Sequence, residues 1–281
     1  MSFDYQKRLS TKTPESAITA LLNKMSMESV FCTHSTFSSP WDISMPAIEN
    51  CMMFHLVLQG KAKLQVQSDS IQMNAGDFIL LPKGTGHNLS DETTSIYTTL
   101  HDLPIEIVND NFERLEFGGG GTNTIMLCGA ITFRHPLTMR LLGILPNEIL
   151  INKDSEVNEV VKTLAKLLSN EALNTAIGSS GAISRLADLM VLTALRQYLE
   201  SQKDNKLGWI GALEDKRISK AIQLVHESPS SHWSLQDLAS KVGMSRTGFA
   251  VEFKRLVGNS PMDYLTEWRM SLAYVDLQNT K

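Results

Sequence analysis

The stretch that decides the fold is SLQDLASKVGMSRTGFAVEFKRLVGNSP, from Ser234 to Pro261. Ser234 can cap a first short helix, with Asp237 three positions on to complete a capping box, and Ser245 can cap a second helix. Gly243 lies between the two helices and suits a tight turn. The pattern therefore predicts a helix-turn-helix.

Each predicted helix has one apolar face at helical spacing. These faces hold Leu235, Leu238, Ala239 and Val242 in the first helix and Phe249, Phe253, Leu256 and Val257 in the second. The other face of the second helix carries cations, hydroxyls and small apolar groups, namely Ser245, Arg246, Thr247, Ala250, Val251, Lys254 and Arg255. Such groups match base edges and thymine methyls in a major groove, so this face predicts binding to double-stranded DNA.

The alternative is an ordinary helical hairpin, since caps and an apolar face occur in any helical protein. The glycine turn, the serine cap of the second helix and the exposed cations favour DNA binding over that alternative. Charge alone does not suggest DNA, because residues 209–281 hold nine Lys plus Arg against eight Asp plus Glu. We therefore expect modest non-specific affinity.

Length and composition are those of an ordinary globular chain with two domains: 281 residues, 42% hydrophobic and 20% charged. The polar start MSFDYQKRLSTKTPESAI does not read as a signal peptide, and no segment reaches about 18 apolar residues. We expect a cytoplasmic protein without a membrane partner. Cys32, Cys51 and Cys128 are an odd, widely spaced set, which predicts reduced thiols rather than disulfides.

The first half of the chain is rich in short alternating strands separated by turns, which predicts a sandwich or barrel. The glycine run at 118–121 lacks the Lys and Ser or Thr of a phosphate loop, so we interpret it as a strand connection. After Pro136 the period becomes helical, with helices predicted at 157–169, 182–198 and 218–226 and a polar linker at 200–206. The first two of these helices either form a dimer interface or cover one another and the strands. The resulting domains are 1–135, 136–206 and 207–281.

Further motifs carry a resemblance to a known family. In the carboxy-terminal part they are SLQDLASKVGMS, Phe249, Phe253 with Lys254, Gly258, Pro261, Tyr264 with Leu265, and Trp268 with Arg269. In the amino-terminal part they are Pro40 with Trp41, FHLVLQG from Phe54, GDFILLPKGTGH from Gly76, GGGGTNTIMLCG and HPLTMRLLGILP. Together they resemble the AraC/XylS transcriptional regulators, in the branch with a cupin-like amino-terminal domain.

The resemblance implies an α+β multidomain fold with an amino-terminal cupin-like β-barrel, a helical connecting segment and a carboxy-terminal all-α helix-turn-helix domain. It implies a non-enzymatic transcriptional regulator that binds DNA, responds to a small-molecule effector and forms a homodimer. Family members carry a second helix-turn-helix after the linker helix, which we place at 262–277, whereas this sequence ends at QNTK. A truncated regulator that partners a longer relative, or a single unit that suffices in a dimer, both stay open.

The residues Gly76, Pro82, Gly84 and His87 are similar in spacing to the second cupin motif, whose histidine is a metal ligand in cupin enzymes. Only His55 stands where the first motif supplies its ligands. Cys128 or His34 could complete a set with His55 and His87, and mixed His and Cys ligation would suit zinc. We prefer the structural reading of these residues, with no cofactor, and keep a metal-dependent cupin enzyme as the alternative.

Overall fold

The computed structural model describes residues 22, 27–94, 96–133, 136–174, 176–201 and 208–279. Its contacts divide the chain into two compact units, one made of residues 26–134 and 139–201 and the other including residues 202–281. Residues 139–201 thus belong with the strands, whereas the sequence pattern separates 136–206 as a connector. The reason is that the helices of this segment bury their apolar sides against a sheet.

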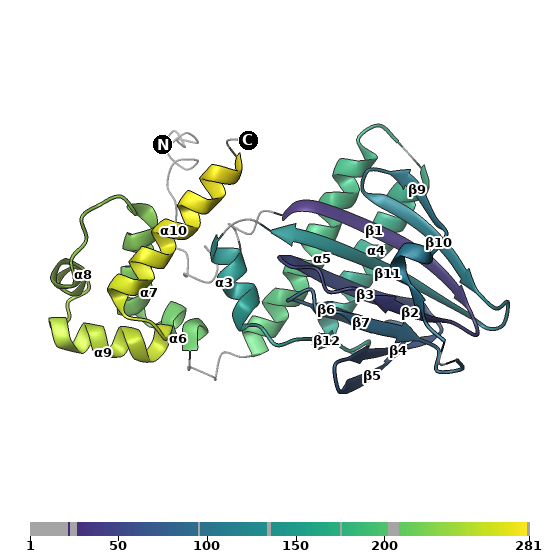
Figure 1. The fold of residues 1–281 in the computed structure, drawn as a ribbon, viewed down its shortest axis with the longest axis horizontal. Helices are drawn as coiled ribbons and strands as arrows, with labels where there is room; N and C mark the ends of the chain where they lie inside the picture. The colour runs from purple at the N-terminus through teal and green to yellow at the C-terminus, as the bar shows by residue number, and fades with distance from the viewer. Residues whose placement is uncertain are drawn as a thin grey trace, which may run out of the picture. The chain divides into compact units, whose positions relative to one another are not determined.

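The first unit contains two β-sheets (Figure 1). Its strands are β1 (Met27–Ser38), β2 (Asp42–Met45), β3 (Cys51–Gln59), β4 (Lys61–Val66), β5 (Asp69–Asn74), β6 (Phe78–Leu81), β7 (His87–Ser90), β8 (Thr98–Thr99), β9 (Ile105–Asn109), β10 (Phe112–Gly118), β11 (Asn123–Phe133) and β12 (Ile149–Ile151), with a 3₁₀ turn η1 (Leu100–Asp102). The larger sheet has the order β12-β6-β3-β11-β1-β10-β9 and the smaller one β5-β4-β7-β2-β8. The sandwich or barrel that the strand pattern predicts is observed as two sheets.

The core of this unit lies between the sheets. It is made of side chains that alternate along the strands, including Phe37, Trp41, Ile43, Val57, Leu64, Met73, Leu89 and Met126. Side chains alternate between the two faces of a strand, and in β3 both faces are buried. One face holds Cys51, Met53, His55 and Val57, and the other holds Met52, Phe54 and Leu56. His55 therefore shares the face of β3 whose apolar neighbours line the core.

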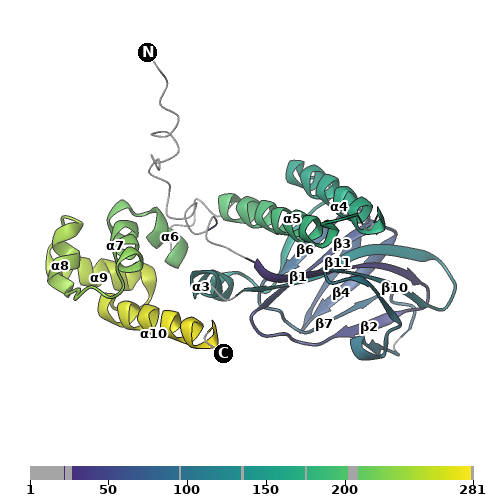
Figure 2. The same cartoon turned by 90° about the horizontal axis from the view of Figure 1, so that it is seen from above.

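After β11 the chain forms three helices, with β12 between the first two: α3 (Pro136–Ile144), α4 (Glu156–Asn174) and α5 (Ser179–Ser201). Figure 2 shows α4 and α5 over one face of the larger sheet, where α5 contacts β1. Helix α4 is longer than the predicted 157–169, and α5 is longer than the predicted 182–198. In both helices the apolar face extends beyond the predicted ends, into segments that also carry polar residues. The predicted linker at 200–206 overlaps the end of α5 at its first two residues, and the remainder lies outside the described residues.

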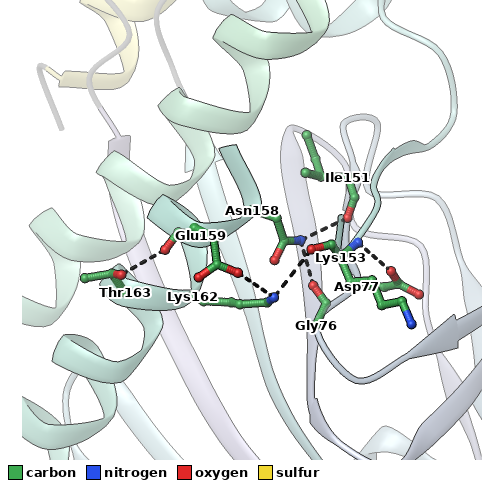
Figure 3. A network of polar contacts seen from close by, with 8 residues as sticks. All are labelled: Gly76, Asp77, Ile151, Lys153, Asn158, Glu159, Lys162 and Thr163. Carbon is green, nitrogen blue, oxygen red and sulfur yellow. Dashed lines mark hydrogen bonds and ion pairs between the residues drawn. The ribbon is translucent and has the colours of Figure 1, made fainter. Parts of the chain in front are cut away.

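A polar network joins the turn before β6 to the start of α4 (Figure 3). The fully buried Asn158 donates through Nδ2 to the carbonyl oxygens of Gly76, at 2.6 Å, and Ile151, at 3.3 Å. The carboxylate of Asp77 accepts from the backbone N–H of Lys153 at 2.9 Å. Buried backbone groups need such partners, so this network fixes the β12–α4 connection against the GDFILLP segment.

The second unit is helical, with α6 (Gly208–Glu214), α7 (Lys216–Glu227), α8 (Leu235–Lys241), α9 (Arg246–Val257) and α10 (Pro261–Asn279). Its core holds Ile222, Val225, Leu238, Ala239, Phe249, Phe253, Leu256, Tyr264, Leu265 and Trp268. Helices α8 and α9 form the predicted helix-turn-helix, and α10 is the predicted linker helix. None of the helices among the described residues is long and apolar enough to cross a membrane.

Candidate functional site

The two helices of the helix-turn-helix begin and end where the sequence predicts. Ser234 accepts a hydrogen bond from the N–H of Asp237 at 3.1 Å, and the Asp237 carboxylate accepts from the N–H of Ser234 at 3.1 Å, which completes the capping box. Gly243 has a φ of 67°, and Ser245 caps α9 by accepting from the N–H of Gly248 at 3.1 Å. Local hydrogen bonds thus set the length and start of α9.

The candidate DNA-binding residues occupy the exposed side of α9. Arg246, Thr247, Val251 and Lys254 are exposed, Ala250 is half-buried, and Ser245 stands at the cap. Val251 is 63% exposed, an unusual position for a branched apolar side chain in a small helical unit. The opposite side of α9 is packed into the core through Phe249, Phe253 and Leu256. The helix therefore presents a surface of cations and small apolar groups on a rigid support.

The last candidate of that set, Arg255, has a partner that the sequence analysis did not identify. It donates through Nε and Nη2 to the two carboxylate oxygens of Glu252, at 2.9 and 2.6 Å. Hydrogen bonds from Arg255 hold the pKa of Glu252 below its usual value. The three-residue spacing on one helix was a usable signal for this pair.

The linker helix holds the segment in front of α8. Arg269 donates to the carbonyl oxygens of Pro229 at 2.7 Å and Ser231 at 2.8 Å, and the Trp233 indole donates to the Ser228 carbonyl oxygen at 2.9 Å. A planar guanidinium matches two carbonyl acceptors held side by side. These bonds orient the start of α8. No local sequence signal reveals the two bonds of Arg269, because their acceptors lie about 40 positions away.

In the other unit, His55 and His87 meet inside the sandwich, with their Nε2 atoms 2.8 Å apart. His87 Nδ1 lies 2.9 Å from the Thr85 carbonyl oxygen, which can only accept, so Nδ1 carries the proton. His87 Nε2 is then an acceptor, and His55 must donate to it through its own Nε2–H. Within the described part of the chain, no group bonds to His55 Nδ1.

Among the candidate metal ligands, His55 and His87 are in direct contact. The two imidazoles bond each other, and burial raises the pKa of the Cys128 thiol to about 12. Cys128 is directly opposite His55 in the strand register, but among the described residues no three His, Cys, Asp or Glu side chains are grouped to hold a metal ion. His34 is wrong as a candidate ligand: Thr33 opposes Cys128, so His34 points to the other face of the sheet.

The histidine pair gives the sandwich a pH-dependent stability. Burial lowers the pKa of both His55 and His87, and the neighbouring His87 lowers that of His55 further. The unfolded chain takes up protons on these groups below about pH 6.5, whereas the folded chain resists, so stability is full above that pH and falls below it. We expect the free energy of unfolding to drop by up to about 1.4 kcal/mol per pH unit for each histidine, measured by urea titration between pH 7.5 and 5.5.

The double variant His55→Leu/His87→Met is the control for this prediction. It removes both titrating groups from the sandwich and leaves its carboxylates in place, so the decrease below pH 6.5 should flatten. An unchanged pH profile in the double variant would assign the decrease to other groups.

The first unit also has a shallow polar pocket of about 460 Å³. It is lined by Gln72, Asn74, Asp77, Asn152, Lys153, Asp154 and Ser155, next to the network that fixes the β12–α4 connection. The volume is in the range of small-molecule sites.

Comparison with known proteins identifies the family of this chain. The profile of the family described as Cupin matches residues 17–200, which is more than half of the chain. Putative AraC-like transcription regulators of Streptomyces antibioticus and Streptomyces lividans are 28% and 29% identical to it, over 79% and 78% of this chain and 72% of each relative. This chain belongs to the AraC/XylS regulators with a cupin domain.

A further relative comes from a different bacterium. The HTH-type transcriptional regulator MtrA of Neisseria gonorrhoeae is 25% identical over 243 residues, which cover 85% of this chain and 78% of that relative. Membership in the AraC/XylS family accounts for both the capped helix pair with its cationic face and the cupin sandwich in one chain. The recognition from residues alone is thereby confirmed, and the protein is a DNA-binding transcriptional regulator.

Proposed function

We propose that this AraC-family protein reads a specific DNA site by inserting α9 into the major groove. The observation that supports this most directly is the exposed face of α9, where Arg246, Thr247, Val251 and Lys254 stand on a helix whose other side is buried. Direct readout needs such donors and apolar contacts at the base edges, while other cations of the surface meet the phosphates.

Substitutions at the two ends of this face test the proposal. Arg246→Ala is expected to cost roughly 1–3 kcal/mol on the preferred duplex and to relax the choice of one base, because a bidentate contact to a base edge is lost. Lys254→Ala is expected to weaken binding evenly on all sequences and to reduce the salt slope by about one, because a phosphate contact is lost. Gel-shift titrations with a selected duplex and its single-base variants measure both. Equal losses on every sequence for both variants would contradict the assignment.

We also propose that a homodimer is the DNA-binding form. The described residues hold one helix-turn-helix, and one recognition helix makes few phosphate contacts, so pairing two helices raises the effective concentration of the second contact. Sedimentation combined with gel shift at physiological salt tests this. Nanomolar, sequence-specific binding by a demonstrated monomer would contradict it.

A small molecule bound by the cupin unit is the proposed effector. The pocket of about 460 Å³ supports this proposal, because its residues Asp77 and Lys153 belong to the network that fixes the start of α4. A molecule bound in the pocket would therefore act on α4. Its lining points to a small polar molecule. We expect cytoplasmic action because DNA is the proposed partner. Relatives named as transcriptional regulators support a non-enzymatic role.

A further inference from the structure

The cations on the exposed side of α9 are not equivalent. Arg255 is held by Glu252 through two hydrogen bonds, at 2.9 and 2.6 Å. Within the described residues, the side chains of Arg246 and Lys254 have neither a hydrogen-bond nor an ion-pair partner. The face thus presents two uncommitted cations and one that is neutralised by an acid on the same helix.

Two more charges extend this pair at the start of α7. Asp215 caps α7 by accepting from the N–H groups of Arg217 and Ile218, and its carboxylate lies 3.7 Å from the Arg217 guanidinium. Both Asp215 and Arg217 are close enough to Glu252 to act on its charge, and Asp215 acts on Arg255 as well. The alternating charges hold the Arg255 side chain on the flank of α9 that faces the α6–α7 junction, since α6 packs against α9.

A released arginine at this position would bind phosphate without regard to sequence. Each phosphate contact expels counterions and strengthens binding to every duplex equally. In a specific complex, base contacts would fix the position of α9 and would leave Arg255 on its flank. In a non-specific complex there are no such contacts, and the protein settles where its cations meet phosphates. Neutralising Arg255 therefore weakens non-specific complexes more than the specific one.

We propose that Glu252 is a specificity-determining residue that restrains Arg255 and thereby suppresses sequence-independent binding to DNA. The inference rests on the proposed function, because it requires α9 to be the DNA-reading helix. The near balance of nine cationic and eight acidic residues in 209–281 fits a unit whose general attraction to DNA is kept low.

The test measures fluorescence anisotropy of the full chain on two labelled 30-base-pair duplexes. One is a mixed-sequence pool, and the other is a duplex that the wild-type protein enriches from that pool. Glu252→Gln is expected to tighten binding to the mixed pool roughly three- to tenfold near 0.1 M salt and to steepen its salt slope by about 0.9, the value of one phosphate contact. The gain on the enriched duplex should be smaller, so the affinity ratio falls.

The matched control is Glu227→Gln, which removes one negative charge from α7, where Glu227 accepts from Gln223 rather than from an arginine. It should leave the affinity for the mixed pool within about twofold, since no cation is released. The double variant Glu252→Gln/Arg255→Gln should return to the wild-type affinity. Glu252→Ala gives a second version of the same change, with a residue of higher helix propensity, in case the amide disturbs folding.

Each other outcome overturns the inference. An equal rise in Glu227→Gln means that net charge alone matters, and a rise that persists in the double variant means that Arg255 is not the released group. Equal gains on both duplexes would show that Glu252 has no effect on specificity. A loss of affinity confined to the enriched duplex would show that Glu252 contacts a base itself. Failure of the wild type to enrich any duplex would overturn the proposed function and, with it, this inference. The other outcomes overturn only the inference about Glu252.

Discussion

Replacing Phe253 with alanine is expected to unfold the helix-turn-helix unit or leave it barely stable. Phe253 is 1% exposed, and its ring packs against Phe249 and Tyr264 with centroid distances of 5.5 and 5.6 Å. Tyr264 in turn bonds to His226 of α7 at 2.8 Å, so the phenylalanine connects α9 to both neighbouring helices. Truncating a buried phenylalanine costs about 3–5 kcal/mol, close to the whole stability of a small domain.

Urea unfolding followed by far-UV circular dichroism measures this loss, and gel shift should show the disappearance of DNA binding. The matched control is Val251→Ala on the same helix, because Val251 is 63% exposed and its truncation should change the free energy of unfolding by no more than about 0.5 kcal/mol. Similar stability of the two variants would mean that α9 is not anchored through Phe253.

The second large effect is expected at Gly84, in the GDFILLPKGTGH segment. Gly84 has a φ of +58°, and a Cβ added there would lie 2.0 Å from the carbonyl oxygen of Ile48 and 2.8 Å from that of Cys51. Both contacts are with backbone atoms, which cannot rotate away as a side chain can. Gly84→Ala should therefore lower the free energy of unfolding of the cupin unit by about 2–5 kcal/mol, from backbone strain together with overpacking.

Gly120→Ala separates the two causes. Gly120 also has a positive φ, of 87°, but a Cβ there would meet nothing within 4 Å, so only the backbone strain of about 1–2 kcal/mol applies. Thermal unfolding of both variants by calorimetry gives the comparison. If Gly84→Ala were no more harmful than Gly120→Ala, the approach of the Ile48 backbone would not matter to stability.

Much of the DNA-binding unit could be predicted from the sequence because its signals are local. Ser234 with Asp237 and Ser245 with Gly248 satisfy helix ends within three residues, and the apolar spacing of Phe249 and Phe253 sets the buried face. The glycine run at 118–121 was likewise interpreted correctly as a connection, here between β10 and β11.

The sandwich interior was less predictable because it depends on strand register. A shift of one residue moves a side chain to the other face, and this is why His34 could not be separated from His55 and Cys128 as a candidate ligand before the β1–β11 pairing was known. The contact between His55 and His87 joins two strands 32 positions apart, which the motif spacing alone does not establish.

The sequence by itself determined the fold class, the helix-turn-helix and the residues on the exposed face of α9, since caps, turns and periodicity act over one or two helical turns. Only the tertiary structure decided that the two histidines bond each other, and that Arg269 holds the carbonyls of Pro229 and Ser231. It also showed that two acids, Glu252 of α9 and Asp215 at the cap of α7, act on Arg255. These arrangements depend on where distant segments meet, which the packing of the whole chain determines.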